Sequence, residues 1–439
     1  MIAATRDISA IVGVDLAAWG IARREDDAVT DTTINQDALL LEILMTPEGK
    51  ADPYPRYKAI REHSAVFESS LGALVVGRYD DCNWVLREPR LGRGPQREPW
   101  EQYGLTKAEW HERFPMRTGE TTSLLLMDPP DHTRLRKLVV KAFTARNVEK
   151  MRPDVARLTD DLIGDFDGVV DVMSALALHL PITVIGEMLG VPEPMRSELQ
   201  PLIRATVATL EFMPSLEAMD EAAAAIEQVI ARFEDLITAR RSDPTDDLLS
   251  MLIHVEEEGD QLSHEELLST ILLLFAAGFE TTTNLIGNGL LALLDHPDQF
   301  EKLRGDRSLM PTAVEELLRW DSPVQLNGRA ALEPVEFHGM QIEAGQQFFT
   351  LLGAANRDGR MYPEPDTFDI TRETVQPMSF GGGIHYCLGA SLARLEGQVV
   401  FDRLLDRFET IEPAWGDERP KYRDSIVLRG LEALPVRFA

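Results

Sequence analysis

Apolar residues recur along most of the chain at the spacing of three and four that amphipathic helices require, as between residues 134 and 239. Short apolar runs typical of strands are confined to two segments, a predicted hairpin over 65–76 and strands within 330–352. No glycine- or serine-rich linker separates a second unit. The pattern therefore predicts a mostly α fold with small β-sheets, of the α+β class. We place it in a single large helical domain over residues 41–439, after an N-terminal extension over residues 1–40.

The longest predicted helix runs from Ser263 to about Asp295. Ser263 followed by Glu266 forms a capping box that starts the helix, and His296-Pro297 ends it. At 1.5 Å per residue, its ~32 residues extend over ~48 Å. Apolar residues surround its first half on every face, so we expect this helix to pass through the interior of the protein.

A polar cluster interrupts this apolar helix, where the sequence AAGFETTTN places Glu280, three threonines and an asparagine in a row. Burying a carboxylate costs several kcal/mol unless it is paired or hydrogen-bonded. One interpretation is a solvent-facing notch, or threonines that bond back to their own helix. The other is a water-lined groove in which Glu280 and Thr281 relay protons, with Ala277 and Gly278 leaving room for a ligand.

The most informative segment is SFGGGIHYCLGASLARLEG, near the C-terminus. Its three consecutive glycines, among them Gly381 and Gly383, permit backbone turns that other side chains would block. Cys387 follows where a helix starts, so free backbone N–H groups favour its thiolate. Gly389 removes a side chain two residues later, where a flat ligand could lie close.

A lone cysteine in such a loop is compatible with several kinds of chemistry. The usual state of a single cysteine is a buried, inert thiol, and we assign that state to Cys82. For Cys387, a catalytic pair with His385 is one alternative, but no acyl-transfer motif lies nearby, and one thiolate is a poor zinc site. Haem iron, in contrast, needs only one protein ligand because the porphyrin supplies four.

Composition and charge exclude several classes of protein. A chain with 44% hydrophobic and 27% charged residues is neither fibrous nor wholly disordered. Its net charge of −29 disfavours nucleic acid and anionic lipid as partners. Two distant cysteines make no disulfide framework, and the most apolar run, over 267–278, is too short to cross a ~30 Å hydrocarbon layer. We therefore expect a cytoplasmic protein that binds neither membrane nor nucleic acid.

These motifs together resemble those of the cytochrome P450 family. The haem-binding signature F-x-x-G-x-x-x-C-x-G is matched by four residues: Phe380, Gly383, Cys387 and Gly389. The segment AGFETT resembles the oxygen-activation groove of the family, and AVEELLRW carries its E-x-x-R pair as Glu316 and Arg319. The motifs occur in the family's order, and the resemblance extends over residues 50–439. The segments MDPPDHTRLR, SPVQLNGR and AANRD are most similar to soluble bacterial members, particularly actinobacterial and mycobacterial ones.

The resemblance implies haem b as the cofactor, with the Cys387 thiolate as the axial iron ligand. It implies that Glu280 and Thr281 steer protons to dioxygen, with Glu in place of the Asp that is frequent in the family. It also implies further contacts with haem from eight residues: His132, Arg136, Ala277, Arg329, Phe380, Gly381, His385 and Gly389. The basic side chains of this set would bind the haem propionates. For His132 and Arg136, the alternative is a solvated charged face of a helix.

Other residues are expected to shape the scaffold and the substrate pocket. Glu316 and Arg319 would tie the core to the loop before the cysteine, and Asn356, Arg357 and Phe368 are expected to be scaffold residues. The substrate is expected to be an apolar small molecule of the steroid, fatty-acid, terpenoid or macrolide class. The expected pocket walls are four residues, Ala276, Val324, Gln325 and Leu326, and the segments 91–127 and 206–216.

The resemblance implies a haem-thiolate monooxygenase that receives electrons from a separate ferredoxin and ferredoxin reductase. The chain carries no P-loop, dinucleotide-binding motif or cysteine cluster of its own. One alternative is a peroxide-driven hydroxylase or a haem-thiolate isomerase, although such relatives tend to replace the acid–alcohol pair. Another is a haem-binding protein that oxygenates nothing, such as a gas sensor or carrier.

A basic cluster stands out against the acidic composition. Between His132 and Arg152 the chain carries seven Lys or Arg residues and one acid. One interpretation is a solvated helix face. The other is a docking site for an acidic ferredoxin-type donor, with contacts from four residues: Arg134, Lys137, Lys141 and Arg146. We expect the protein itself to be a monomer.

Overall fold

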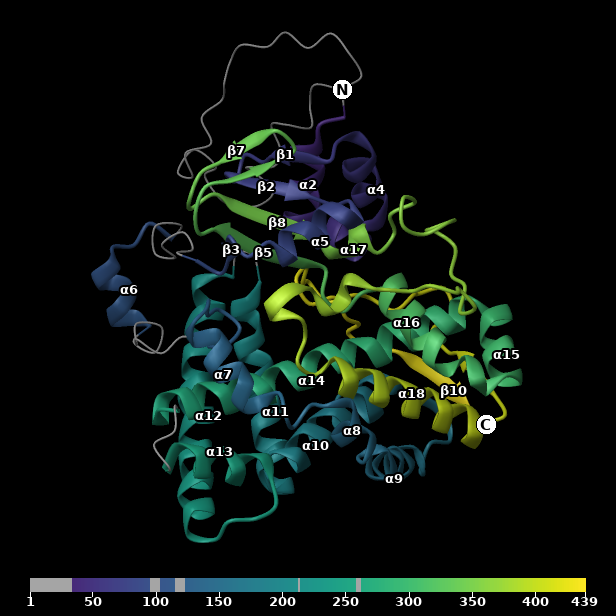
Figure 1. The fold of residues 1–439 in the computed structure, drawn as a ribbon. Coiled ribbons are helices and arrows are strands. Elements are labelled where there is room, and N and C mark those ends of the chain that lie inside the picture. Colours follow the sequence, from purple (N-terminus) through teal and green to yellow (C-terminus); the bar gives the residue numbers. More distant parts are fainter. Residues whose placement is uncertain (1–33, 95–102, 115–122, 212–213, 258–261) are drawn as a thin grey trace.

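The computed structural model describes residues 34–94, 103–114, 123–211, 214–257 and 262–439. Figure 1 shows two adjoining regions: a sheet region, drawn mainly in purple and green, and a larger helical region around the long helix α14 (His264–Asp295). The helices of the sheet region are α2 (Gln36–Met45), α3 (Pro47–Ala51), α4 (Tyr54–His63), α5 (Tyr79–Arg87) and α17 (Leu352–Ala355). The mostly α fold with small sheets agrees with the prediction from the sequence.

The helical region contains most of the remaining elements. Its helices are α6 (Lys107–Arg113), α7 (Asp131–Val139), α8 (Ala145–Glu149), α9 (Arg152–Ile163), α10 (His179–Met188), α11 (Glu193–Val207), α12 (Leu216–Ser242), α13 (Leu248–Glu257), α15 (Pro297–Gly305), α16 (Met310–Trp320) and α18 (Ala390–Arg407). Short helical turns are η4 (Met173–Ala177), η5 (Ala208–Leu210), η6 (Arg307–Leu309), η7 (Met378–Phe380) and η8 (Gly383–His385). Helices α10, α16 and α18 pack against α14 and form the core of this region.

The main sheet joins the two segments in which strands were predicted. Its order is β1 (Val66–Glu68), β2 (Ala73–Val76), β8 (Gln347–Leu351), β5 (Leu326–Ala331) and β3 (Leu91–Gly92). The predicted hairpin is β1 with β2, and β2 then pairs in parallel with β8, so that Val75 lies opposite Phe349. All four residues of β2 are buried. The sheet therefore packs the N-terminal hairpin against a strand from the last quarter of the chain.

Two further sheets are smaller. Strands β6 (Val335–Phe337) and β7 (Met340–Ile342) form a hairpin inside the predicted strand segment. A three-stranded sheet of β4 (Gly168–Asp171), β10 (Pro435–Phe438) and β9 (Ile411–Pro413) was not predicted. These strands have only three or four residues each, too few for alternation to stand out.

Helix α14 has the predicted ends but a different distribution of burial. The capping box is present, because Ser263 and Glu266 bond each other's backbone N–H groups, and the helix ends at Asp295 with His296 as its cap. Burial is continuous over residues 282–294, in the second half, whereas the first half is only partly buried and Ala277 is exposed. The prediction that the first half is enclosed on every face is therefore wrong. Apolar composition marked the helix as internal but not which of its faces is covered.

By length and composition α14 would also suffice to cross a membrane. Its mean hydropathy reaches 1.3 over an 18-residue window, yet 67% of that window is buried inside the protein. Burial of this degree is what the central helix of a folded domain shows.

The first described helix crosses the domain boundary expected at residue 40. Asn35 caps α2 by accepting a hydrogen bond from Ala38 N. Leu40 and Ile43 of this helix are fully buried against the sheet region. Most of the expected N-terminal extension, residues 1–33, lies outside the described residues.

Candidate active site

The cysteine loop is held against α5 by a close backbone approach. Gly383 has a φ of +65°, and a Cβ at this position would lie 2.2 Å from the carbonyl oxygen of Leu86. No other residue fits there. Gly381 also has a positive φ, of +66°. Beyond these turns, Cys387 N donates a hydrogen bond of 2.9 Å to the carbonyl of Phe380, which closes the loop.

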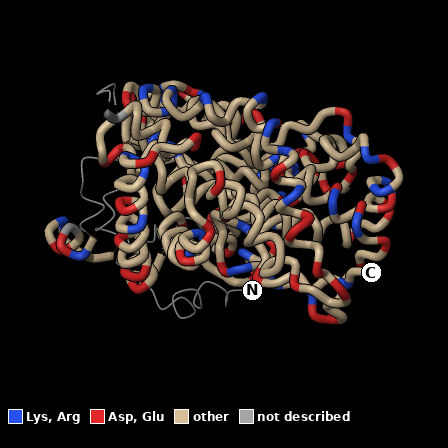
Figure 2. The backbone as a smooth tube through the Cα atoms, turned by 90° about the horizontal axis from the view of Figure 1, so that it is seen from below, with Lys and Arg blue, Asp and Glu red and all other residues tan. Residues whose placement is uncertain are grey.

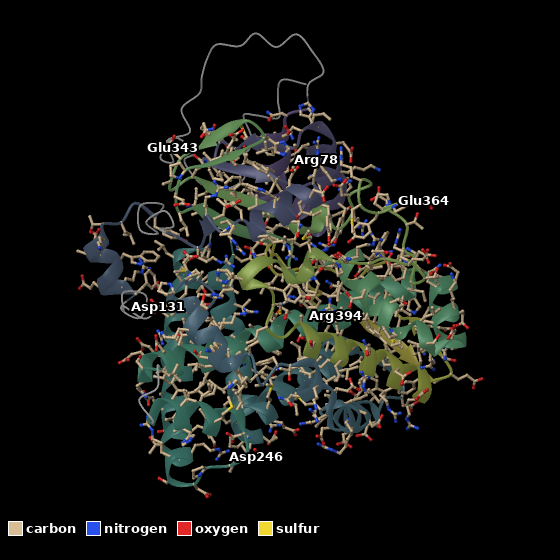
Figure 3. All side chains as sticks on the ribbon, in the orientation of Figure 1. Arg78, Asp131, Asp246, Glu343, Glu364 and Arg394 are labelled. Carbon is tan, nitrogen blue, oxygen red and sulfur yellow. The ribbon has the colours of Figure 1, made fainter. Side chains whose placement is uncertain are left out.

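Arg394, labelled on α18 in Figure 3, braces the same loop from the side. Its guanidinium lies 4.3 Å from the centre of the Phe380 ring and donates to the Tyr386 hydroxyl at 3.2 Å. It also forms a bidentate ion pair with Glu315 of α16. The loop is therefore fixed to two helices of the core.

The protein by itself does not lower the pKa of the Cys387 thiol. Burial raises this pKa, and the Gly389 backbone together with Arg136 and Arg394 opposes the rise. The backbone at the helix start thus favours the thiolate, as expected from the sequence, but burial outweighs this effect. A Cβ on Gly389 would meet no atom within 4 Å, so the space at this glycine, two residues after Cys387, is open.

The acid of the polar cluster is buried and ion-paired. Glu280 is 1% exposed and lies in direct contact with the guanidinium of Arg423, while Arg204 of α11 lies 3.9 Å away. Arg423 also donates to Asn284 Oδ1 at 2.5 Å. Sequence reasoning missed Arg423, because nothing in the segment around it signals an ion pair with a residue of α14.

The threonines of the cluster bond partly to their own helix, as the first interpretation held. Thr281 Oγ1 donates to the carbonyl of Ala277 at 3.0 Å. Thr283 Oγ1 bonds the carbonyls of Ala177 and Phe279 and is fully buried. Only Thr281 stands on the same open face as Ala277, one turn apart.

Gly278 has a packing role and leaves no room for a ligand. A Cβ on Gly278 would lie 3.1 Å from the Ile185 side chain of α10. The glycine therefore allows α14 and α10 to approach each other. Of the two small residues assigned to ligand space, only Ala277 faces an open side.

Five basic side chains gather next to the cysteine loop. They are Arg93 after β3, His132 and Arg136 on α7, Arg329 on β5 and His385 on η8. The rings of His132 and His385 lie 4.2 Å apart, and Arg136 donates to the Tyr386 carbonyl at 2.5 Å. The structure thus brings together all four residues expected to bind propionates, and it adds Arg93.

This cluster has many donors and few acceptors. Both ring nitrogens of His132, Nε2 of His385 and Nε of Arg93 are buried without a hydrogen-bond partner among the described residues. Burial lowers the pKa of His385 to about 2 and that of Arg329 to about 9, with neighbouring arginines adding to both effects. Burial also lowers the pKa of His132 and of Arg136. Such a cluster is built for an anionic ligand with several oxygen acceptors.

Glu316 and Arg319 form a fully buried bidentate ion pair. Both side chains are 0% exposed, and the two N–O distances are 2.6 and 2.7 Å. Arg319 also donates to the carbonyls of Asn356, Pro365 and Thr367. Glu316 in turn accepts from Asp369 N and from Arg372. The pair therefore fastens α16 to the loop over 356–372, as the sequence implied.

The residues expected to be scaffold lie around this pair. Asn356 Oδ1 accepts from Met378 N at 2.6 Å, which ties the loop to η7 directly before Phe380. Arg357 lies 3.7 Å from the ring centres of both Tyr54 and Trp320. Phe368 is buried beside Trp320.

The residues expected to wall a substrate pocket lie on α14 and in the segment that leads into β5. Ala276 packs partly buried on α14, near Ala277. Gln325 is 0% exposed and donates to the Tyr54 hydroxyl and the Ser322 carbonyl, and Leu326 belongs to the apolar core of the sheet region. Val324 pairs with Leu428 in an isolated bridge and packs against the apolar cluster that contains Phe348 of β8. Parts of the segments 91–127 and 206–216 lie outside the described residues.

A glycine-bounded cysteine with open space beside it, next to a buried basic cluster, defines a haem-thiolate protein. Cys387 would supply the axial ligand, and the basic cluster would bind the propionates. Comparison of the sequence with known protein families identifies the family, because the cytochrome P450 family model matches residues 182–434. The chain belongs to this family, its cofactor is haem b with iron, and it is a monooxygenase.

Bacterial relatives cover nearly the whole chain. Cytochrome P450 107B1 of Saccharopolyspora erythraea is 43% identical over 395 residues, covering 88% of this chain and 95% of the relative. Vitamin D(3) 25-hydroxylase of Pseudonocardia autotrophica is 41% identical over 88% of this chain and 93% of its own length. P450BioI, solved in complex with an acyl carrier protein bearing hexadec-9Z-enoic acid, is 36% identical with a TM-score of 0.81, over 90% of this chain and 99% of that one. The resemblance to bacterial members is thus confirmed.

Proposed function

We propose that this protein hydroxylates an apolar small molecule with dioxygen, using electrons from a ferredoxin and its reductase. The observation that carries the proposal is the pairing of buried Glu280 with Thr281 on the open face of α14. Relatives support the substrate class: they include a hydroxylase of vitamin D(3) and one of 6-deoxyerythronolide B, and structures with myristic acid and with testosterone. Steroid, fatty-acid, terpenoid and macrolide substrates all fall within this class.

Haem, when bound, supplies the binding and activation of dioxygen, and the residues of α14 supply directed protons. Thr281 places its hydroxyl on the open face and holds it toward the Ala277 carbonyl at 3.0 Å. Glu280 is the proton source behind it, and Arg423 positions its carboxylate. Arg204 and Arg423 place two guanidinium groups beside the Glu280 carboxylate.

The acid–alcohol pair argues against the peroxide-driven alternative. A peroxide-driven enzyme receives its oxygen atoms already reduced and protonated, so it does not need a relay of this kind. A gas sensor or carrier would likewise have no use for a buried carboxylate beside the open face.

We further propose that the single domain acts as a cytoplasmic monomer.

Replacing Thr281 with alanine is expected to uncouple electron consumption from product formation. The variant should retain haem and substrate binding, because one hydroxyl contributes only about 1 kcal/mol to folding. Without the hydroxyl, protons reach dioxygen unselectively, so hydrogen peroxide should leave in place of product. The measurement is the ratio of product and peroxide to NADPH consumed, with ferredoxin and reductase present, and we expect product per NADPH to fall several-fold.

Thr281→Ser is the matched control, since it restores the hydroxyl and should restore most of the coupling. An unchanged ratio of product to peroxide in Thr281→Ala would refute the relay. Failure of the parent protein to consume NADPH with any apolar substrate, together with turnover on added peroxide alone, would refute the proposed function.

The basic cluster on α7 and α8 supplies a candidate docking surface for the electron donor. Lys137, Lys141 and Arg146 are exposed and form no ion pair within the described part of the chain. Arg134, in contrast, is committed to Glu266 and Asp131, so its charge is largely neutralised. Figure 2 shows acidic and basic positions spread along the whole tube. Against this mixed distribution, a group of cations without ion-pair partners is distinctive.

Apolar side chains lie beside these cations. Val140 is 40% exposed, and Ile384 and Tyr386 of the cysteine loop are 48% and 38% exposed. The bond from Arg136 to the Tyr386 carbonyl holds the two segments together. An apolar centre with a cationic rim is the composition of a transient protein interface. We therefore propose that the donor docks over α7 and the cysteine loop, on the side of the thiolate.

Reversing the charge of Lys137 and Lys141 is expected to slow reduction by the donor. Attraction between exposed charges steers association and is screened within ~8 Å at 0.15 M salt. The variant Lys137→Glu/Lys141→Glu should therefore accept the first electron several-fold more slowly at low ionic strength and lose most of its salt dependence. Stopped-flow reduction with an acidic ferredoxin measures both effects.

The matched control is Lys302→Glu/Lys421→Glu, which makes the same change in net charge at two exposed positions on α15 and near the C-terminus. This control should be reduced at nearly the parent rate. Equal slowing in the two double variants would mean that net charge alone acts, and unchanged kinetics in Lys137→Glu/Lys141→Glu would place the docking surface elsewhere.

A further inference from the structure

Arg93 lies at the edge of the main sheet, where a carboxylate fixes its backbone. Asp128 accepts hydrogen bonds from the backbone N–H groups of Arg93, at 2.8 and 3.0 Å, and of Gly94, at 2.7 Å. A Cβ on Gly92 would lie 2.3 Å from Asp128 Oδ1, so glycine at that position permits this approach. The Asp128 carboxylate is therefore hydrogen-bonded to backbone N–H groups, and these bonds fix the backbone position from which the Arg93 side chain extends.

The Arg93 side chain points into the basic cluster beside Arg329. Nη1 of Arg93 donates to the carbonyl of Gly328 at 3.2 Å, and Nη1 of Arg329 donates to the same carbonyl at 2.9 Å. Nε of Arg93 is buried and has no partner among the described residues. Arg329 Nη1 also donates to Asn327 Oδ1 at 2.6 Å, whereas Arg93 has only the shared Gly328 carbonyl among the described residues. The two guanidinium groups therefore lie close together, and Arg93 Nε–H has no acceptor there.

The charges of the cluster do not balance within the protein. Arg93, Arg136 and Arg329 carry three positive charges, whereas Asp128 carries one negative charge. Two positive charges are left over, and haem b carries two propionates.

We propose that Arg93 binds a haem propionate, together with Arg329, and that it is one of three arginines that neutralise the two propionates. Its free Nε–H and the Nη groups beyond the Gly328 carbonyl are the donors for this contact. This contact would involve only Arg93 and the cofactor, so it does not depend on which substrate or electron donor the protein uses.

The proposal predicts opposite effects with and without haem. In the haem-free protein, Arg93 adds repulsion to a buried basic cluster, which offsets its single hydrogen bond to the Gly328 carbonyl, so Arg93→Gln should leave thermal stability unchanged or raise it. In the haem-loaded protein, the same substitution removes a charge-assisted hydrogen bond, which corresponds to about a tenfold or greater change in affinity. A residue with a merely structural role would lower stability in both states.

The test measures the rate at which ferric haem passes from the full-length protein to excess apomyoglobin. Arg93→Gln should release haem about tenfold faster than the parent, and Arg93→Lys should release it at an intermediate rate. Arg90→Gln is the matched control, because Arg90 lies three residues earlier, has a side chain that is 42% exposed and pairs only with Glu88 among described residues. It should leave the rate unchanged. The propionate bending band in resonance Raman spectra should shift in Arg93→Gln and not in Arg90→Gln.

Haem dimethyl ester separates propionate binding from other causes. In protein reconstituted with the ester, which has no carboxylates, Arg93→Gln and the parent should release the cofactor at rates within twofold of each other. Equal acceleration with haem and with its ester would overturn the proposal, as would an unchanged release rate or an unchanged Raman band with natural haem.

Discussion

Replacement of Cys387 with alanine is expected to abolish the long-wavelength Soret band of the reduced, carbon-monoxide-bound protein. That band reports thiolate ligation of the iron, and Cys387 is the thiol that the glycine turns present next to open space. The substitution should also abolish monooxygenase turnover, because the electron donation from the thiolate that favours O–O cleavage is lost. The measurement is a reduced carbon-monoxide difference spectrum, normalised to haem content.

Cys82→Ser provides the control within the same chain. Cys82 is 0% exposed, its sulfur lies 3.5 Å from the Val76 carbonyl, and burial raises its pKa well above the ordinary value. A serine hydroxyl can bond the same carbonyl, so the band per haem should be unchanged. A normal band in Cys387→Ala, or its loss in Cys82→Ser, would contradict the assignment of the ligand.

The second large effect is expected at the buried ion pair of α16. Arg319→Ala should lower the free energy of unfolding by about 3–5 kcal/mol, because it leaves the Glu316 carboxylate buried and removes three bonds to loop carbonyls. Arg372, which lies 3.2 Å from Glu316, compensates for part of the loss. Arg319→Lys should recover little, since an ammonium group cannot reproduce the bidentate fork. The measurement is urea unfolding of the haem-loaded protein, followed by circular dichroism.

The exposed pair of Arg232 and Glu198 serves as the comparison. Its N–O distance is 2.9 Å and both side chains are about half exposed, at 52% and 54%. Arg232→Ala should therefore cost less than about 1 kcal/mol. Similar losses in Arg232→Ala and Arg319→Ala would show that burial does not decide the strength of the α16 pair.

The residues that the sequence identified correctly share one property: their signals are local. A capping box marked the start of α14, three glycines marked the turn before Cys387, and a spacing of three residues marked Glu316 with Arg319. Each of these signals lies within a few positions of the residue it identifies. Local patterns of this kind also predicted the hairpin of β1 with β2.

The residues that were missed have partners far along the chain. Arg423 meets Asn284 across 139 positions, and Arg93 meets Gly328 across 235. Neither arginine stands in a motif, and arginines are common on protein surfaces. The covered faces of α14 were also misjudged, because burial depends on which helices pack around it and not on its own composition. The strands β4, β9 and β10 were too short to show a period.

The parallel pairing of β2 with β8 has a consequence during synthesis of the chain. Val75 leaves the ribosome roughly 270 residues before its partner Phe349, which at 5–20 residues per second is a delay of roughly 14 to 54 s. Throughout that time β1 covers one edge of the apolar strand ALVV, and the other edge has no partner. An unpaired apolar strand edge invites association with other chains. The nascent chain is thus open to such association until most of its helical region has been made.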